Sequence, residues 1–276
     1  MSSLLKIRIG SSSYLCKWKP PMPKGLRYLT YFEGISPADN PVSPESRKGP
    51  AGVFSNPSAP YGASTVTVPQ DGGVYAGVPA LQFIRKDTAA TAGSSTELTA
   101  MVDSMMSGKG SVSLETVLYV GSLAAQGNKW MGIGIELTGG KYFTLGINTY
   151  DDTTRGILVG FPKVTTYSAA DGFHAFEQDN DKTVSFSSDD AAERLGLGIH
   201  HLAVVMDRVA GRTRGYIDGA LAGTMDTATF TTVSDVTIYN SLNTSILTTQ
   251  FAIFDGDRST DGGAAYPVPA KPYTKF

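Results

Sequence analysis

The sequence contains one cysteine, Cys16, no run of apolar residues as long as a membrane helix, and no excess of charge of either sign. A single cysteine excludes an intrachain disulfide, and Tyr14 and Leu15 beside it indicate packing rather than a nucleophile. A membrane-spanning helix needs about 20 apolar residues, so membrane insertion is not expected. The 23 basic residues are balanced by 25 acidic ones, and without a sustained positive field we expect no nucleic-acid partner.

Residues arranged for catalysis are also scarce. There are three histidines, and His200 and His201 are adjacent, so on a strand they would point to opposite faces and could not easily bind one metal ion. The segment from 177 to 181 comes nearest to the paired carboxylates of retaining glycosidases, but it lacks the second glutamate at the required step. No Gly-x-Ser-x-Gly motif occurs. These observations predict that the protein is not an enzyme and has no cofactor.

What the sequence does contain is typical of an all-β protein. Its 31 glycines and 15 prolines separate many short segments rich in Val, Ile, Thr, Tyr and Phe, as expected for strands and turns. Helical periodicity is confined to two short segments, Glu97 to Met106 and Asp189 to Leu195. No low-complexity linker interrupts residues 51 to 258, so one large domain is expected.

The stretch from His200 to Thr224 carries the most information. Leu202, Val204 and Met206 alternate along a strand and should share one face. Asp218 and Gly219 follow a second strand and form a strong hairpin signal, since both positions of such a turn need a positive φ. We assign Asp218 and Gly219 a structural role in this turn and no ligand.

This run resembles the signature of the concanavalin A-like, laminin-G-like jelly-roll superfamily. Four other segments are similar to strands of that family and occur in the expected order: 26 to 34, 80 to 83, 112 to 120 and 250 to 255. The resemblance implies an antiparallel jelly-roll β-sandwich, which we place at residues 26–258, with extended N- and C-terminal arms.

The two arms are basic, rich in proline and aromatic. Residues 1–25 are expected to be a docking arm in which Tyr14, Leu15 and Trp18 anchor the protein to neighbouring subunits, since aromatic residues dominate interface energetics. Residues 259–276 are expected to be an extended tail of the same kind. Proline-rich segments of this type cannot form a core alone and tend to lie along another surface.

Two polar clusters are candidates for sugar or calcium binding. The first comprises Asn148, Asp151 and Asp152, and the second Asp179, Asn180 and Asp181. Carboxylates and carbonyls on a loop are ligands that calcium prefers. The alternative is that these residues initiate turns by hydrogen bonding to their own backbone, and neither cluster reproduces a fixed calcium-loop pattern.

The first residues lack the pattern of a secretory signal, so the protein is expected to be made and assembled in a cytoplasm, as phage particle proteins are. We therefore predict a non-enzymatic structural or adhesion component of a virion, either a capsid decoration or a tail-associated protein. Its expected partners are other virion subunits, including copies of itself, and a cell-surface glycan. The alternatives are a carbohydrate-binding lectin and a glycan-degrading, glucanase-like enzyme.

Overall fold

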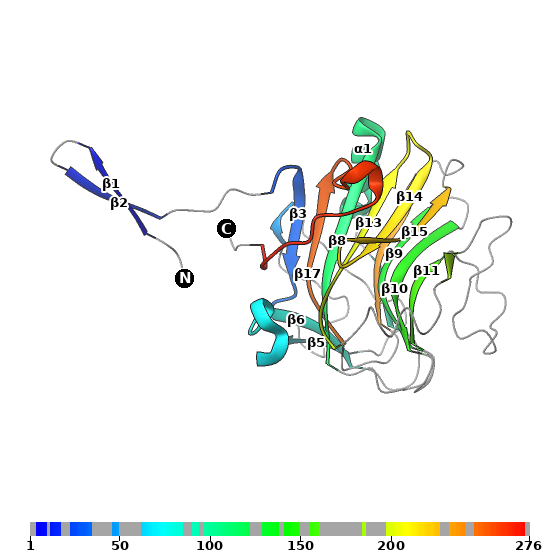
Figure 1. Ribbon diagram of the computed structural model, residues 1–276, viewed down its shortest axis with the longest axis horizontal. Coiled ribbons are helices and arrows are strands. Elements are labelled where there is room, and N and C mark those ends of the chain that lie inside the picture. Colours follow the sequence, from blue (N-terminus) through cyan, green and yellow to red (C-terminus); the bar gives the residue numbers. More distant parts are fainter. Residues whose placement is uncertain are drawn as a thin grey trace.

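The computed structural model shows an all-β sandwich of two antiparallel sheets (Figure 1), which confirms the predicted fold class. The jelly-roll connectivity stays a prediction. The structure describes the following residues: 4–9, 12–17, 23–34, 46–49, 62–84, 90–93, 96–121, 129–137, 141–149, 155–160, 184–185, 197–226, 232–240 and 246–273.

The larger sheet contains the strands that the family resemblance singled out. Its main path runs β15 (Ala220–Asp226), β14 (Arg212–Ile217), β13 (Gly198–Asp207), β8 (Ser111–Val120), β17 (Ile246–Asp255), β3 (Leu26–Tyr31) and β4 (Ser46–Lys48), and β5 (Gly62–Thr67) and β6 (Pro79–Ile84) join at β17. The predicted strand pair of the His200 to Thr224 run is therefore confirmed as β13 and β14, with Leu202 opposite Ile217.

The smaller sheet forms the second layer. Its order is β12 (Val184–Ser185), β11 (Arg155–Gly160), β10 (Lys141–Thr149), β9 (Lys129–Leu137), β16 (Val233–Asn240) and β7 (Ala90–Gly93). Every described pairing in it is antiparallel. Alternation along each strand therefore gives this sheet one face toward the core and one outer face.

The core lies between the two sheets. Leu202, Val204 and Met206 are fully buried in it, together with Phe251 and Ile253 from β17, as the alternation predicted. Helix α1 (Thr96–Lys109) confirms the first helical prediction and packs four apolar residues into the same core: Leu98, Val102, Met105 and Met106. The second predicted helix, at 189–195, lies outside the described residues. None of the described helices has the length and apolar character needed to cross a bilayer.

At the N-terminus, β1 (Leu4–Ile9) pairs with β2 (Ser12–Lys17), and Figure 1 shows this hairpin apart from the sandwich. Tyr14 and Leu15 lie in β2, whereas Trp18 lies outside the described residues. The docking role of residues 1–25 stays a prediction.

The hairpin turn between β14 and β15 lies where the sequence predicted it. Asp218 and Gly219 have φ values of 50° and 83°, as the turn type requires. Asp218 also accepts a hydrogen bond from the His201 backbone N–H at 2.8 Å and lies 2.7 Å from the Nδ1 atom of His200. A β-carbon at position 219 would lie 2.9 Å from the backbone oxygen of Tyr266, so glycine is also needed because the C-terminal segment passes this close to the turn.

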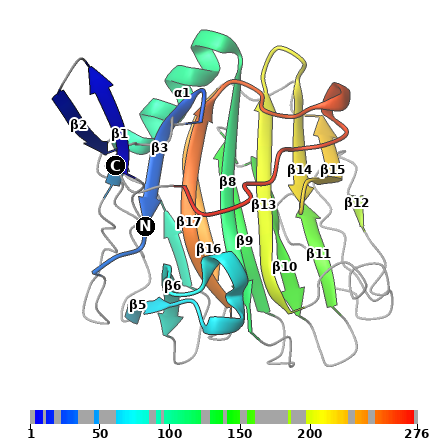
Figure 2. The same cartoon turned by 60° about the vertical axis from the view of Figure 1, so that its left-hand side comes forward.

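The C-terminal segment does not extend outward as an arm. Residues 256–273 cross the outer face of the larger sheet, and Figure 2 shows this segment in red in front of β17, β8 and β13. Tyr266 packs with Ala203, Val205 and Tyr216, and Tyr273 packs on the cluster that contains Phe254. Residues 259–276 were expected to be an extended tail suited to docking on neighbouring subunits. The two tyrosines of this segment cover their own sheet, because Ala203 and Val205 of β13 and Ala252 and Phe254 of β17 are apolar residues on its outer face.

Candidate carbohydrate-binding face and a buried charged network

The predicted sugar or calcium residues are only partly described by the structure. Asn148 lies in β10. The other five residues of the two clusters, Asp151, Asp152, Asp179, Asn180 and Asp181, lie outside the described residues. Among the residues that the structure describes, no group of three or more His, Cys, Asp or Glu could hold a metal ion.

Asn148 belongs to the outer face of the smaller sheet. In β9, Ile133 and Ile135 are fully buried in the core, as is Leu145 in β10. Residues at the alternate positions of these strands therefore belong to the opposite, outer face. Asn148 is three residues beyond Leu145 and is an alternate position in β10.

The strand register places unlike residue types in rows across this outer face. Trp130 is opposite Asn148, Gly132 lies between Gly146 and Tyr239, Gly134 lies between Thr144 and Thr237, and Glu136 lies between Tyr142 and Asp235. The two middle rows, hereafter the glycine rows, contain Gly132, Gly134 and Gly146 among their six residues, and Gly132 and Gly134 are buried. The outer rows carry aromatic, amide and acidic residue types.

This distribution has a simple chemical meaning. Glycine leaves the middle of the face flat, because it has no side chain. Aromatic residues offer large apolar surfaces, and amide and acidic residues supply hydrogen-bonding groups that fix a ligand's orientation. The C-terminal segment and η1 (Gln70–Tyr75) lie on the larger sheet (Figure 2), so neither of them covers the glycine rows.

A network of charged residues is buried on the outer face of the larger sheet. Glu115 of β8 is 0% exposed. Its carboxylate lies 3.3 Å from Nε2 of His201 on β13 and accepts a hydrogen bond of 3.1 Å from Nη1 of Arg258. The Tyr273 hydroxyl donates to the same carboxylate. The C-terminal segment therefore supplies two of the three groups that contact Glu115.

These contacts determine how Glu115 ionises. Burial by itself would raise the pKa of this carboxyl, but the hydrogen bond and charge of His201 and the charge of Arg258 hold the pKa below its ordinary value of 4.5. Burial raises the pKa of Tyr273, and the nearby Glu115 carboxylate raises it further. Glu115 is therefore a charged group that the C-terminal segment keeps out of water.

Sequence reasoning missed both of these arrangements. Glu115 was a detectable signal, because it is an acidic residue inside the otherwise apolar and hydroxyl-bearing strand 111–120, and buried charges are seldom left unpaired. The glycine rows were harder to detect, because they depend on the pairing of β9 with both β10 and β16. Alternation alone could not identify those partners.

No family description and no curated protein matches this chain. Among solved structures it is similar to a Trypanosoma rangeli sialidase in complex with 2,3-difluoro-KDN, with 14% identity and a TM-score of 0.49 over 93% of this chain and 34% of that one. A conserved carbohydrate esterase from the Shiga toxin-encoding bacteriophage phi24B aligns with 13% identity and a TM-score of 0.43 over 71% of this chain and 90% of that one.

The receptor-binding domain of a botulinum neurotoxin of mosaic serotype C/D is a third similar structure, with 8% identity and a TM-score of 0.42 over 83% of this chain and 48% of that one. The chain thus spans about a third of the sialidase and about half of the toxin domain. At these identities and TM-scores, no residue or activity is carried over from any neighbour.

The prediction that the protein is not an enzyme is nevertheless contradicted. The similar structures include sialidases and a carbohydrate esterase, so the resemblance to an all-β sandwich does not by itself assign a structural role. The prediction also relied on finding paired carboxylates within one strand. A pattern within one strand cannot reveal acidic residues that are paired across neighbouring strands, as Glu136 and Asp235 are in the register of β9 and β16.

Proposed function

We propose that this protein is a carbohydrate-binding β-sandwich domain and that the glycine rows of the smaller sheet are its binding face. The observation that carries the proposal is the register of β9 between β10 and β16, which aligns Gly132 with Gly146 and Trp130 with Asn148. A saccharide would lie across these rows, with its apolar ring face on an aromatic residue and its hydroxyl groups hydrogen bonded to amide and acidic residues.

Replacing Trp130 with alanine tests this location. The intact protein is first screened on a glycan array, and affinity for the best ligand is then measured by isothermal titration calorimetry. We expect Trp130→Ala to weaken binding about tenfold or more, because truncating a central aromatic residue at a binding surface costs on the order of 2 kcal/mol. Asn148→Ala should weaken binding less, since it removes hydrogen bonds worth about 1 kcal/mol.

The matched control is Trp18→Ala, the same change at the other of the two tryptophans. Circular dichroism of each variant should show an unchanged fold. If Trp130→Ala and Trp18→Ala bind the ligand equally well, the binding face is not on the smaller sheet. If the wild-type protein retains no glycan, the proposed function is wrong.

Glycan cleavage at the same face is a second candidate function, favoured by one observation. Glu136 and Asp235 are direct partners across β9 and β16, next to a register shift between Val233 and Asp235. Directly opposed residues of an antiparallel pair have β-carbons about 4.5–5.5 Å apart, and retaining glycosidases hold two carboxyl groups about 5–5.5 Å apart. Register shifts of this kind also occur often beside active sites, where they re-aim a residue.

If the face is catalytic, incubation with the bound glycan should release reducing ends, and the product should keep its anomeric configuration. Glu136→Gln and Asp235→Asn should each slow release by about 100-fold or more while the glycan remains bound. The control is Glu97→Gln, which changes an exposed acid on α1. Binding without cleavage by the wild-type protein would restrict the function to carbohydrate binding.

A further inference from the structure

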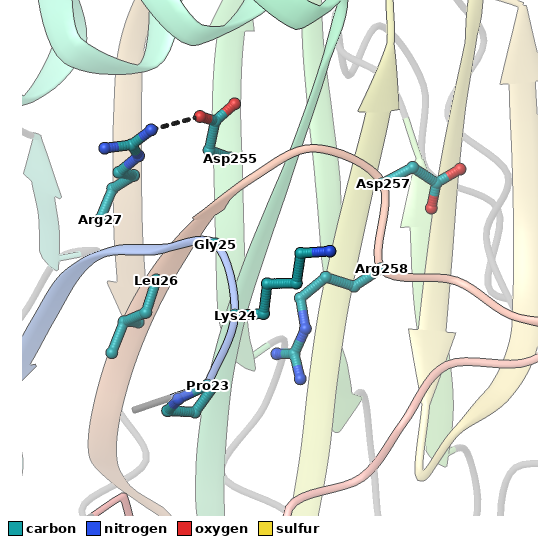
Figure 3. Close-up of a pocket in the computed structure, with 8 residues that line it drawn as sticks. All are labelled: Pro23, Lys24, Gly25, Leu26, Arg27, Asp255, Asp257 and Arg258. Carbon is teal, nitrogen blue, oxygen red and sulfur yellow. Dashed lines mark hydrogen bonds and ion pairs between the residues drawn. The ribbon is translucent and has the colours of Figure 1, made fainter. Parts of the chain in front are cut away.

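A pocket of about 710 Å³ lies at the edge of the larger sheet, away from the glycine rows (Figure 3). One wall is the turn that leads into β3, residues 23–27, and the other is the segment that leaves β17, residues 255–258. The Asp255 backbone N–H donates to the Gly25 oxygen at 2.8 Å, which holds the two walls together. Sites for small molecules commonly have volumes of about 300–1,000 Å³, so the pocket is large enough for one.

Both carboxylates of the pocket are already neutralised. Asp255 accepts a hydrogen bond of 2.7 Å from Nη2 of Arg27, as the dashed line in Figure 3 marks. Asp257 accepts one of 2.5 Å from Nη2 of Arg214, and its other oxygen accepts from the Ser259 backbone N–H and hydroxyl. Neither acid is therefore available to balance a further cation.

Arg258 is held in a fixed position in the same pocket. Its Nη1 donates to Glu115 at 3.1 Å and to the Tyr273 hydroxyl at 3.3 Å, and its guanidinium carbon lies 3.8 Å from the centre of the Phe254 ring. A guanidinium has five N–H donors. Within the described part of the chain, the donors on Nε and Nη2 have no acceptor, so a pre-positioned side of the guanidinium remains for a ligand.

Lys24 adds a second cation. Its side chain is drawn next to that of Arg258 in the middle of Figure 3, and both residues line the pocket. Lys24 is exposed, and among the described residues no carboxylate pairs with it. In Figure 3 the Lys24 ammonium and the Arg258 guanidinium point toward opposite ends of the pair, so Lys24 adds positive charge to the pocket, while an oxyanion would be bound by the free side of the guanidinium.

We propose that this pocket is a binding site for a small ligand that carries an oxyanion, with the free side of the Arg258 guanidinium as the group that binds the anion and Lys24 as a second positive charge in the same pocket. The proposal is independent of the carbohydrate-binding face, because the two sites are on different sheets. A saccharide carboxylate and a free inorganic anion share this chemistry, and the choice of probe distinguishes them.

The test is calorimetric titration of the full chain at low ionic strength with D-glucuronate, inorganic sulfate and, as the uncharged control, D-glucose. We expect at least one of the two anions to bind and glucose not to bind. Tighter binding of glucuronate would identify a sugar acid as the ligand class, and tighter binding of sulfate would identify a free oxyanion. Added sodium chloride should weaken either interaction, because salt screens exposed charges.

Lys24→Gln is the main variant, since Lys24 is exposed and removing its charge leaves the Arg258 contacts in place. It should weaken anion binding by about tenfold, the effect of losing one nearby positive charge that contributes about 1.4 kcal/mol. Lys271→Gln is the matched control, an exposed lysine on the C-terminal segment that does not line the pocket. Equal affinities of the two variants, or binding of neither anion by the wild-type protein, would overturn the proposal.

Discussion

Replacing Glu115 with leucine is expected to lower the free energy of unfolding by about 3–5 kcal/mol, the cost of removing one partner of a buried charged network. The change leaves Arg258 and His201 without their shared acceptor while it keeps an apolar side chain of similar size in the sheet. Guanidinium denaturation followed by circular dichroism measures the loss. The control is Glu97→Leu, which makes the same change at an exposed position and should alter stability by less than about 0.5 kcal/mol.

The Glu115 carboxylate should also make the stability of the fold depend on pH. Because the pKa of Glu115 in the folded protein lies below the ordinary value of 4.5, ionised Glu115 stabilises the fold at pH values above its pKa in the unfolded chain. This stabilisation is lost as the pH falls toward the pKa of the folded state. The unfolding free energy of the wild-type protein should therefore decline on acidification from about pH 5, and Glu115→Leu should flatten that decline. Parallel pH profiles for the two proteins would show that Glu115 does not contribute.

Ending the chain after Arg258 is expected to lower the free energy of unfolding nearly as much as Glu115→Leu does. Such a chain keeps every strand of both sheets but loses Tyr266, which is 3% exposed, and Tyr273, which contacts Glu115 and Phe254. Complete burial of a large side chain is worth about 1.5–3 kcal/mol, so a loss of about 3 kcal/mol or more is expected from the two tyrosines. The exposed sheet face should also bind an apolar fluorescent dye.

The matched control is a chain that ends after Tyr273, which keeps both tyrosines. Denaturation midpoints of the two shortened proteins should differ clearly, with the longer one close to the full chain. If the chain that ends at 258 is as stable as the full chain, the C-terminal segment is an independent tail and the sandwich is complete at residue 258.

Much of the fold could be predicted because its signals are local. Leu202, Val204 and Met206 alternate within one strand, and the Asp218-Gly219 turn needs only two residues to define it. Helix α1 was recognisable because its apolar residues repeat with the period of a helix. Each of these features depends on neighbours a few positions away, and sequence patterns contain that information directly.

The candidate sites depended on contacts between residues distant in the sequence. Glu115 meets Arg258 and Tyr273 only because the C-terminal segment folds back over β8, a separation of 143 and 158 residues. Glu136 is opposite Asp235 only because β9 pairs with β16. The surface that the tail covers could not be predicted for a related reason: its proline-rich composition indicates an extended chain that lies on a surface but does not identify that surface.

A chemical-shift map of the labelled protein tests directly whether the glycine rows of the smaller sheet bind carbohydrate. Backbone amide signals are recorded while the oligosaccharide that binds best on the array is added. We expect the shifts to concentrate at Gly132, Gly134 and Gly146, which belong to β9 and β10. Shifts confined to the larger sheet, or no shifts with any oligosaccharide, would contradict binding at these rows.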